Sequence, residues 1–535
     1  MFYPLFLQGH LPIQHDLHVS DLNNFSLPFR ANLGDGLASG SFPLWNKNAL
    51  CGVPTIAHIQ MGACYPLTWF CYGLFPLPWA HNLYIALCYF IAALGMHLLC
   101  RQWEYCEEAS LVGGLSFAFC GFLCCHLRHL AMLSTACWLP LIVATIEAAF
   151  RKMDYKYPLY FALLWAMQLL AGHPQIAYYC CLFYCFYLCS HLFLNRSRGA
   201  LCKKLLLLFL VALLLGTTLA SVQLLPTYEL SNLWWRGSGV TYKEAIAFPY
   251  HIPDLLNFFR PGINGDPGNC SYKPRSSFYE NYGYIGLLPI ILSLVGAVIA
   301  IFRRGKECFM LLFGVFAFFM LLGPATPLFS LAFHYLPGMS FFRHPTRFML
   351  LLNFILAFLA AFAWQQGRAK FAPTKRVKIG LFLLLIIALD LVYHQQFRFP
   401  SISAKKWLEP PQTAQFLMKE NNPYRYYSVD APFTHLATYR VAGGWWGDLR
   451  PYILQREFLQ PSINLLWDIS SADGYINMTP ERVTKLWGYS SGKLGLVHKL
   501  YERVGPKHQP SALKLSSSFI KLMSLYNVKF FVSML

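Results

Sequence analysis

Charged residues are scarce in this chain of 535 residues, where Asp, Glu, Lys and Arg together make up only 13%. Soluble globular proteins carry about 25% charged residues, so the composition excludes an ordinary soluble domain. Acidic residues are the scarcer sign, with 24 Asp and Glu against 43 Lys and Arg. Because 56% of the residues are hydrophobic and 17% are aromatic, the sequence predicts a polytopic membrane protein.

Common sequence motifs of nucleotide-binding proteins and of hydrolases are also missing. The chain contains no GxxxxGK[ST] loop, no GxGxxG turn after a strand, no GxSxG elbow and no acidic DxD pair. The spacing of its histidines does not match an HExxH or HxxxH zinc motif. We therefore expect no cofactor and no metal site, although the sequence leaves a need for a divalent cation open.

Cysteine is absent from the whole segment after Tyr393, so no disulfide framework holds that segment together. Most of the 17 Cys lie inside apolar segments, where Cys behaves as a small hydrophobe. Cys51, Cys64 and Cys270 lie in segments predicted on the same side of the membrane and could pair, but we expect them to be free thiols. The net charge of +19 comes from short basic clusters and not from one stripe, so we expect no nucleic-acid partner.

Apolar segments long enough to be membrane helices recur along the chain. The first twelve residues are apolar but too short to span, and we interpret Met1 to Pro12 as the outer end of a first membrane helix. Ten further candidate spans follow at 81–100, 109–126, 132–150, 158–171, 176–194, 205–225, 283–302, 308–322, 346–364 and 379–394.

Basic residues separate the two sides of the membrane. Five short connections, at 101–108, 151–157, 195–204, 303–306 and 367–378, hold 16 Lys and Arg. Short loops with many basic residues are typical of the cytoplasmic side. The longer loops at 10–80, 226–282 and 323–345 then lie on the outer side, with everything after about residue 395.

The expected fold is therefore mainly α, a polytopic membrane protein of about 10–11 transmembrane helices. Two domains are predicted, a transmembrane domain over 1–394 and an extracytoplasmic C-terminal domain over 395–535. The second domain is expected to be a small α/β or β-rich unit, because Tyr424–Val429 and Val528–Val532 have strand patterns.

Asp21 is the first candidate for chemistry, with Asp16 nearby. It lies in a polar, Gly- and Pro-rich stretch on the outer face. A carboxylate there could accept a proton from an acceptor hydroxyl as a general base. The alternative is that Asp21 only caps the helical stretch after it or is merely solvated.

Arginines at the mouth of a predicted span are the second candidate. Arg343 and Arg347 lie in the sequence FFRHPTRF, and a guanidinium fork suits phosphate oxygens. The alternative is that these side chains snorkel to lipid headgroups. Arg236 and Glu280 lie in the 226–282 loop, and a lone carboxylate such as Glu280 is more often structural than catalytic.

Polar residues also occur where two apolar segments meet. His173 and Gln175 belong to the sequence GHPQ, and polar groups at membrane depth are often functional. His173 could equally be a satisfied residue at a helix end. His126, Arg128 and His129 form a similar group one hairpin earlier.

A series of short motifs in order resembles the bacterial YfhO-like membrane proteins, which are grouped with the C-type (GT-C fold) glycosyltransferases. The motifs are SDLNNFSLPFR with FPLWN and GVP at 21–54, QMGACYPL at 60–67, CWLPL at 137–141, GHPQ at 172–175, LLPTYEL…R at 224–236, FYENYGYIGLLP at 278–289, FFRHPTRF at 341–348, DGY at 473–475 and YNVKFFVS at 526–533. One departure is Phe25, where the pattern leads us to expect Gln.

The resemblance implies a membrane glycosyltransferase in the bacterial cytoplasmic membrane. Its donor would be a polyprenyl-phosphate sugar, and its acceptor an envelope glycan, a glycolipid or a protein on the outer face. Asp21 would be the general base, while Arg343, Arg347 and Arg236 would hold the donor phosphate. Glu280, His173 and Gln175 would then bind the sugar or the acceptor, and an inverting displacement is expected.

Two other functions remain open from the sequence. A flippase or transporter of a lipid-linked saccharide should carry charges deep in its helix bundle, and Asp390 is the main residue of that kind here. A non-catalytic envelope assembly factor would use the C-terminal domain to bind partners, and Asp21 would be dispensable.

Overall fold

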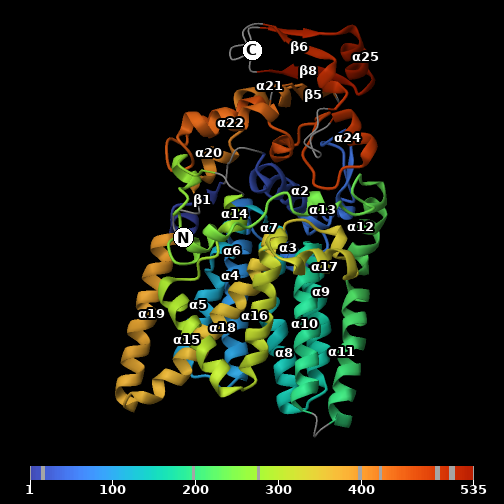
Figure 1. Ribbon diagram of the computed structural model, residues 1–535. Coiled ribbons are helices and arrows are strands. Elements are labelled where there is room, and N and C mark those ends of the chain that lie inside the picture. The colour runs from blue at the N-terminus through green and yellow to red at the C-terminus, as the bar shows by residue number, and fades with distance from the viewer. Residues whose placement is uncertain are drawn as a thin grey trace.

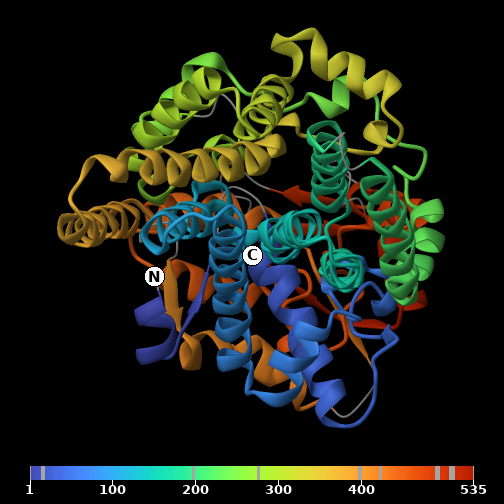
Figure 2. The ribbon, with the colours of Figure 1, turned by 90° about the horizontal axis from the view of Figure 1, so that it is seen from below.

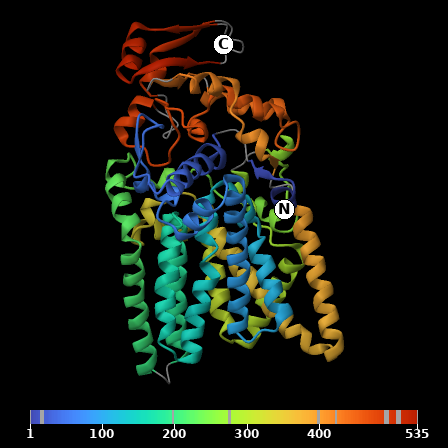
Figure 3. The same ribbon diagram turned by 180° about the vertical axis from the view of Figure 1, so that it is seen from behind.

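The computed structural model describes residues 2–13, 19–195, 199–273, 277–395, 400–420, 424–429, 431–487, 495–504 and 512–533. Long, roughly aligned helices form the lower half of the molecule, and short helices, strands and loops form the upper half (Figure 1). The segment that contains Asp21 lies between the long helices and the C-terminal segment (Figure 3). Asp16, one of the predicted acidic residues, lies outside the described residues.

Within these ranges, seven helical segments are long and apolar enough to cross a membrane. The seven run over Leu77–Gln102, Glu107–Arg128, Leu130–Lys152, Pro174–Leu194, Gly199–Leu219, Pro345–Lys370 and Lys375–Gln395. Two shorter apolar helices, α15 (Leu287–Arg303) and α16 (Glu307–Leu321), and α9 (Lys156–Leu170) belong to the same lower half. Each of the ten predicted spans therefore corresponds to a helix, which confirms a mainly helical, multi-pass chain.

The long segments are built from the following elements. They are α4 (Leu77–Gln102), α5 (Glu107–Ala118), α6 (Gly121–Cys125), η4 (His126–Arg128), α7 (Leu130–Ala136), α8 (Leu139–Lys152), α10 (Pro174–Leu194), α11 (Gly199–Leu219), η10 (Pro345–Phe348), α18 (Met349–Gly367), η11 (Arg368–Lys370) and α19 (Pro373–Gln395). Seen from below, the early helices (blue) and the later ones (yellow) lie on opposite sides of the bundle (Figure 2).

Proline and basic residues mark opposite ends of these helices. Pro174 stands in the first turn of α10, where its missing N–H is tolerated and its fixed φ suits the helix. Arg151 and Lys152 close α8, and Arg303 closes α15. Cations are favourable at a helix C-terminus, and the same residues make the lower loops basic, as expected on the cytoplasmic side.

Close packing inside the bundle relies on small residues and internal hydrogen bonds. A Cβ at Gly296 of α15 would lie 2.3 Å from the carbonyl oxygen of Leu359 in α18, so this contact requires glycine. Asp390 of α19 accepts hydrogen bonds from the backbone N–H of Leu287 at 2.8 Å and from the Tyr284 hydroxyl at 2.5 Å. Asp390 therefore satisfies an orphan N–H at the start of α15, so the contacts of this residue are structural.

The N-terminal residues correct one prediction. Phe2–Leu7 form a short helix, α1, but His10–Pro12 form strand β1, which pairs antiparallel with β4 (Ser401–Ser403). Residues 10–12 are thus not the end of a membrane helix. Their pairing instead ties the beginning of the chain to the segment that follows α19.

The upper half contains the outer loops. Its elements up to residue 341 are η1 (Asp21–Ser26), α2 (Leu27–Ala38), β2 (Trp45–Asn46), β3 (Val53–Pro54), η2 (Thr55–Ala57), η3 (Ile59–Met61), α3 (Pro66–Leu74), α12 (Ser221–Leu233), α13 (Tyr242–Ala245), η6 (Ile252–Phe258), η7 (Pro267–Asn269), α14 (Phe278–Asn281), η8 (Gly323–Ala325), α17 (Pro327–Tyr335) and η9 (Met339–Phe341). All 17 cysteines are free thiols, including Cys51, Cys64 and Cys270.

The C-terminal segment mixes short helices with two-stranded sheets. The two predicted strands are confirmed as β5 (Arg425–Ser428) and β8 (Val528–Val532), which pair in parallel. The other elements are α20 (Ala404–Leu408), α21 (Gln412–Met418), α22 (Ala431–Ala442), α23 (Arg450–Leu454), η13 (Gln455–Phe458), η14 (Ile463–Trp467), α24 (Glu481–Trp487), η16 (Val497–Lys499), β6 (Tyr501–Val504), β7 (Ala512–Leu515) and α25 (Ser517–Leu525).

Candidate active site

Asp21 opens η1, a short π-helix directly above the long helices. The hydroxyl of Ser20 accepts a hydrogen bond from the backbone N–H of Asn23 at 3.2 Å, so Ser20 is the residue that caps this helix. The Asp21 side chain is only 16% exposed. The alternative that Asp21 is merely a cap or a solvated charge is therefore wrong. Short π-helical turns are frequent at functional sites.

Both carboxylate oxygens of Asp21 have a partner from a distant part of the chain. Oδ2 lies 3.2 Å from Nε2 of His129, and Oδ1 accepts a hydrogen bond of 2.5 Å from the Tyr475 hydroxyl. Burial holds the pKa of His129 well below its usual value, and the nearby cation of Arg128 lowers it further. A neutral His129 must carry its proton on Nε2 to hydrogen-bond the carboxylate.

Glu280 of α14 forms the second buried acidic centre. Its Oε1 lies 3.1 Å from Nε of Arg347, while its Oε2 accepts a hydrogen bond of 3.1 Å from Thr346 and lies 3.6 Å from Nε2 of His126. Burial alone would raise the pKa of this carboxyl. The Arg347 cation and the contact with His126 more than offset burial, so the pKa of Glu280 lies well below its usual value.

His126 links the two acidic centres. Its Nδ1 lies 2.8 Å from the carbonyl oxygen of Phe122, which can only accept, so Nδ1 carries a proton. Nε2 lies 3.6 Å from Glu280 and attracts that carboxylate only when Nε2 carries a proton as well. The rings of His126 and His129 have their centroids 5.7 Å apart. A connected layer of polar groups thus runs from Asp21 through both histidines to Glu280 and Arg347.

Arg347 and Gln175 extend this layer across the bundle. Nη1 of Arg347 donates a hydrogen bond of 2.6 Å to Oε1 of Gln175, whose amide nitrogen donates to the backbone carbonyl of Arg343 and to the Tyr179 hydroxyl. Two of the guanidinium nitrogens of Arg347 are therefore bound to protein groups. The observed contacts of Arg347 are structural, since they pair it with Glu280 and Gln175. A role of Arg347 toward a phosphate stays a prediction.

Arg343 and Arg236 differ from Arg347, because neither guanidinium has a hydrogen-bond or ion-pair partner in the described part of the chain. Burial first, and then the neighbouring cations of Arg236 and Arg347, lower the pKa of Arg343 to about 10. Arg236 lies over the Trp235 ring, 4.1 Å from its centroid, and burial lowers its pKa too. Glu244 interacts electrostatically with both arginines but forms no ion pair with either in the described part of the chain. Two half-enclosed cations without a direct ion-pair partner favour the binding of an anion.

His173 and its neighbours hold a tight turn against residues 10–80, the first outer loop. The Nδ1 of His173 accepts a hydrogen bond from the backbone N–H of Ile176 at 3.2 Å and so caps α10. Gly172 has φ of +100°, and a Cβ there would lie 2.2 Å from the carbonyl oxygen of Ile59. The contacts of His173 are those of a helix-capping residue, and a role toward a sugar stays a prediction.

Comparison with protein families identifies the chain. The family described as bacterial membrane protein YfhO matches residues 20–408, well over half of the sequence. This chain belongs to the YfhO family. It is thus a bacterial multi-pass membrane protein, and no curated protein sequence matches it.

Several solved structures are similar to this YfhO protein at low identity. The arabinofuranosyltransferase AftD from Mycobacteria has 14% identity and a TM-score of 0.48 over 78% of this chain, which covers 28% of that protein's length. The oligosaccharyltransferase of Archaeoglobus fulgidus has 13% identity and a TM-score of 0.43, covering 88% of this chain and 61% of its own. ArnT from Cupriavidus metallidurans has 15% identity and a TM-score of 0.35, covering 84% and 73%.

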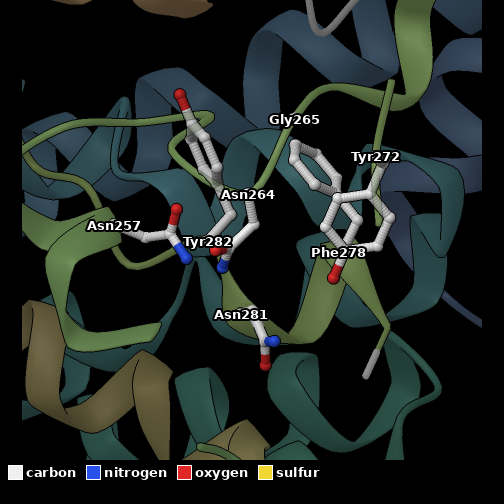
Figure 4. A pocket seen from close by; sticks show the side chains of 7 residues that line it. All are labelled: Asn257, Asn264, Gly265, Tyr272, Phe278, Asn281 and Tyr282. Atoms are coloured by element: carbon white, nitrogen blue, oxygen red, sulfur yellow. The ribbon is translucent and has the colours of Figure 1, made fainter. Parts of the chain in front are cut away.

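A narrow hollow, without room for a water-sized sphere, borders the same polar layer. It lies among Asn257, Asn264, Gly265, Tyr272, Phe278, Asn281 and Tyr282 (Figure 4). The buried carboxylate of Asp254 accepts from Asn264 at 2.6 Å and from Asn281 at 3.0 Å. Because Asn281 and Glu280 are neighbours on α14, these bonds help to fix the carboxylate that faces Arg347.

Sequence reasoning did not find every residue of this site. Tyr475 was part of the DGY motif but had no role, and it belongs to the segment beyond the family match. His126 and His129 were noted only as a polar group. The signal for them was present, since two histidines and an arginine between two apolar spans are costly unless they have partners.

Proposed function

We propose that this protein is a membrane glycosyltransferase of the C type. It would transfer a sugar from a polyprenyl-phosphate donor to a hydroxyl of an envelope glycan, glycolipid or protein on the outer face of the bacterial cytoplasmic membrane. The observation that carries this proposal is the joint presence, in one outer layer, of the enclosed Asp21 carboxylate and two arginines, Arg236 and Arg343, whose guanidiniums form no ion pair in the described part of the chain.

In the proposed reaction, Asp21 removes the proton of the acceptor hydroxyl as that oxygen attacks the anomeric carbon of the donor sugar. The bond between the anomeric carbon and the phosphate oxygen breaks, and the polyprenyl phosphate leaves with the electron pair. Attack from the opposite face inverts the anomeric centre. The proton rests on Asp21 until the product leaves.

The arginine pair, Arg236 and Arg343, would hold the donor phosphate and stabilise the charge that grows on it as the sugar leaves. Burial lowers the pKa of both side chains, and the neighbouring cations of Arg236 and Arg347 lower the pKa of Arg343 further; a bound phosphate would oppose both effects. Arg347 has two nitrogens committed to Glu280 and Gln175. We therefore propose that Arg347, together with Glu280, supports the structure of the site, and that the arginine pair contacts the phosphate.

The proposed sidedness follows from the lower loops, whose basic residues favour the cytoplasm. The elements next to Asp21, Arg236 and Arg343 in the chain, namely α2, α13 and α17, lie with the C-terminal segment at the other end of the bundle (Figure 1). Nucleotide sugars do not reach that side, so a donor already carried across on a lipid fits the absence of nucleotide-binding motifs.

The test compares three variants reconstituted in vesicles. The donors are undecaprenyl-phosphate-linked pentoses and hexoses, supplied with envelope extract as acceptor, and released undecaprenyl phosphate is measured by mass spectrometry. Asp21→Asn is expected to abolish acceptor-dependent release, and Arg343→Ala to weaken use of the donor. Arg368→Ala is the control, because Arg368 lies at the opposite end of the bundle, 3.7 Å from Glu108.

Three results would contradict the proposal. Full release of undecaprenyl phosphate by Asp21→Asn would show that Asp21 is not the base. Equal effects of Arg343→Ala and Arg368→Ala would show that Arg343 does not bind the phosphate. Movement of the intact lipid-linked sugar between leaflets, without release of undecaprenyl phosphate, would identify a flippase instead.

A further inference from the structure

We propose that Tyr475 is a positioning residue of this site, and that residues 471–477 form a clamp that fixes the Asp21 carboxylate. The inference rests on the proposed function, because it assigns Asp21 the role of base. Its starting observation is the 2.5 Å hydrogen bond from the Tyr475 hydroxyl to Asp21, between residues 454 positions apart. The C-terminal segment would then be a working part of the transferase.

The clamp is bound to the first outer loop along its length and not only through Tyr475. A side-chain contact joins Asn477 to Gln60. Three backbone hydrogen bonds join the two segments, from Ser471 N–H to the Asn48 oxygen at 3.1 Å, from Leu50 N–H to the Asp473 oxygen at 2.9 Å and from Cys51 N–H to the Ser471 oxygen at 3.3 Å. Such a ladder fixes the clamp relative to the loop that carries Asp21.

The backbone of Tyr475 is itself held in place. Its N–H donates to the hydroxyl of Ser462 at 2.8 Å, and the same hydroxyl donates to the Tyr475 carbonyl at 3.2 Å. Next to Ser462, the carbonyl of Pro461 accepts a hydrogen bond of 3.3 Å from Asn24 in η1. The helix that carries Asp21 and the backbone that carries Tyr475 are thus connected by a second path, through the adjacent residues Pro461 and Ser462.

Two donors on two oxygens restrict how the carboxylate can turn. His129 binds Oδ2 and Tyr475 binds Oδ1, so the lone pairs that remain have fixed directions. A base held in this way meets an incoming hydroxyl without reorganisation. Loss of the Tyr475 hydroxyl should therefore slow the chemical step and leave donor binding unchanged.

The same contact influences the basicity of Asp21. A hydrogen bond donated to a carboxylate favours its charged form, so removing the hydroxyl should raise the pH at which Asp21 becomes active. Other charged or titratable groups on the described elements that pack against η1 are Arg30 and Asp35 of α2 and His126 and Arg128 of η4, while η3 and η14 carry none. Tyr475→Phe leaves all of these unchanged.

The experiment compares Tyr475→Phe with a matched control in the same segment, Tyr501→Phe. The Tyr501 hydroxyl is hydrogen-bonded too, but far from Asp21 in its partners: it lies 2.8 Å from Nδ1 of His498 and donates to the Val429 carbonyl at 3.3 Å. The assay is release of undecaprenyl phosphate from the most active donor of the set above. We expect Tyr475→Phe to lower kcat roughly tenfold, with KM for the donor unchanged and the acidic limb of the pH profile moved upward.

The possible outcomes distinguish a failure of the clamp alone from a failure of the proposed function. If Tyr475→Phe matches Tyr501→Phe in kcat and in pH profile, the clamp is wrong although Asp21 still acts as the base. If Tyr475→Phe raises KM and leaves kcat unchanged, Tyr475 contacts substrate and does not position Asp21. If Asp21→Asn releases product normally, or the unaltered protein releases none from any donor, both proposals fall.

Discussion

Replacing Glu280 by Gln is the sharpest test of how the polar layer is held together. The Glu280 side chain is 6% exposed and that of Arg347 is 15% exposed, with 3.1 Å between Oε1 and Nε. Glu280→Gln keeps the shape of the side chain but leaves Arg347 as a buried cation without its counter-ion. Breaking a buried ion pair from one side costs about 3–5 kcal/mol of stability.

The pH dependence of this effect follows from the pKa of Glu280. Arg347 and His126 hold that pKa well below 4.5, the value of an ordinary Glu. A depressed carboxyl pKa adds stability that is present above pH 4.5 and is lost as the pH falls below it, toward the pKa of the folded state. The unaltered protein and Glu280→Gln should therefore differ most at pH 7 and converge in strong acid.

The measurement is the free energy of unfolding from a denaturant titration in mixed micelles at pH 7, followed by release of undecaprenyl phosphate. Glu481→Gln is the matched control, because Glu481 pairs with Lys485 at 2.9 Å but both side chains are more than half exposed. Exposed pairs contribute about 0–1 kcal/mol. A loss below about 1 kcal/mol for Glu280→Gln, or a loss equal to that of the control, would refute the reasoning.

Three further predictions concern single residues outside the proposed chemistry. Burial raises the pKa of Asp473 from 3.8 to about 7, so stability should fall as the pH rises between these values. Asp473→Asn should remove that slope and stabilise the protein at pH 8 by up to roughly 4 kcal/mol, read from denaturant titrations at several pH values. Asp390→Leu leaves the Tyr284 hydroxyl without its acceptor and removes one of the two acceptors of the Leu287 N–H. It should cost about 1–3 kcal/mol with product release unchanged, whereas lost activity at full stability would restore a role in transport. Gly172→Ala should lower the yield of folded protein in size-exclusion chromatography, because its Cβ would overlap the Ile59 oxygen.

Hydropathy was sufficient to predict the lower half of the molecule. Every expected span has a helix, and the helices end at basic residues such as Lys152 and Arg303. Both signals are local, because apolar length and loop charge are set by neighbouring residues. His10–Pro12 were the exception, since a short apolar run reveals its secondary structure only through its partner, here Ser401–Ser403.

The site could be predicted only as a set of candidates. Asp21, Arg236 and Arg343 could be singled out for two reasons. A charged side chain at the edge of the membrane is costly unless it has a function, and these residues lie in loops predicted on the outer face. Which charges pair could not be predicted, because Arg347 meets Glu280 across 67 positions and Asp21 meets Tyr475 across 454. Such pairs depend on how the outer loops fold over the bundle, and no local pattern encodes that.

The order of charges along the polar layer explains why Glu280 and Arg347 belong between the two ends. The arginine pair needs uncompensated positive charge to hold a phosphate, while Asp21 needs a neutral partner to stay basic. Arg347 and Glu280 act on His129 in opposite directions, the first lowering its pKa and the second raising it. Because these two effects oppose each other, the ion pair partly cancels its own influence on His129, and burial and Arg128 keep His129 neutral beside Asp21. Tyr475 contacts the Asp21 carboxylate directly, whereas Glu280 reaches it only by way of His126 and His129.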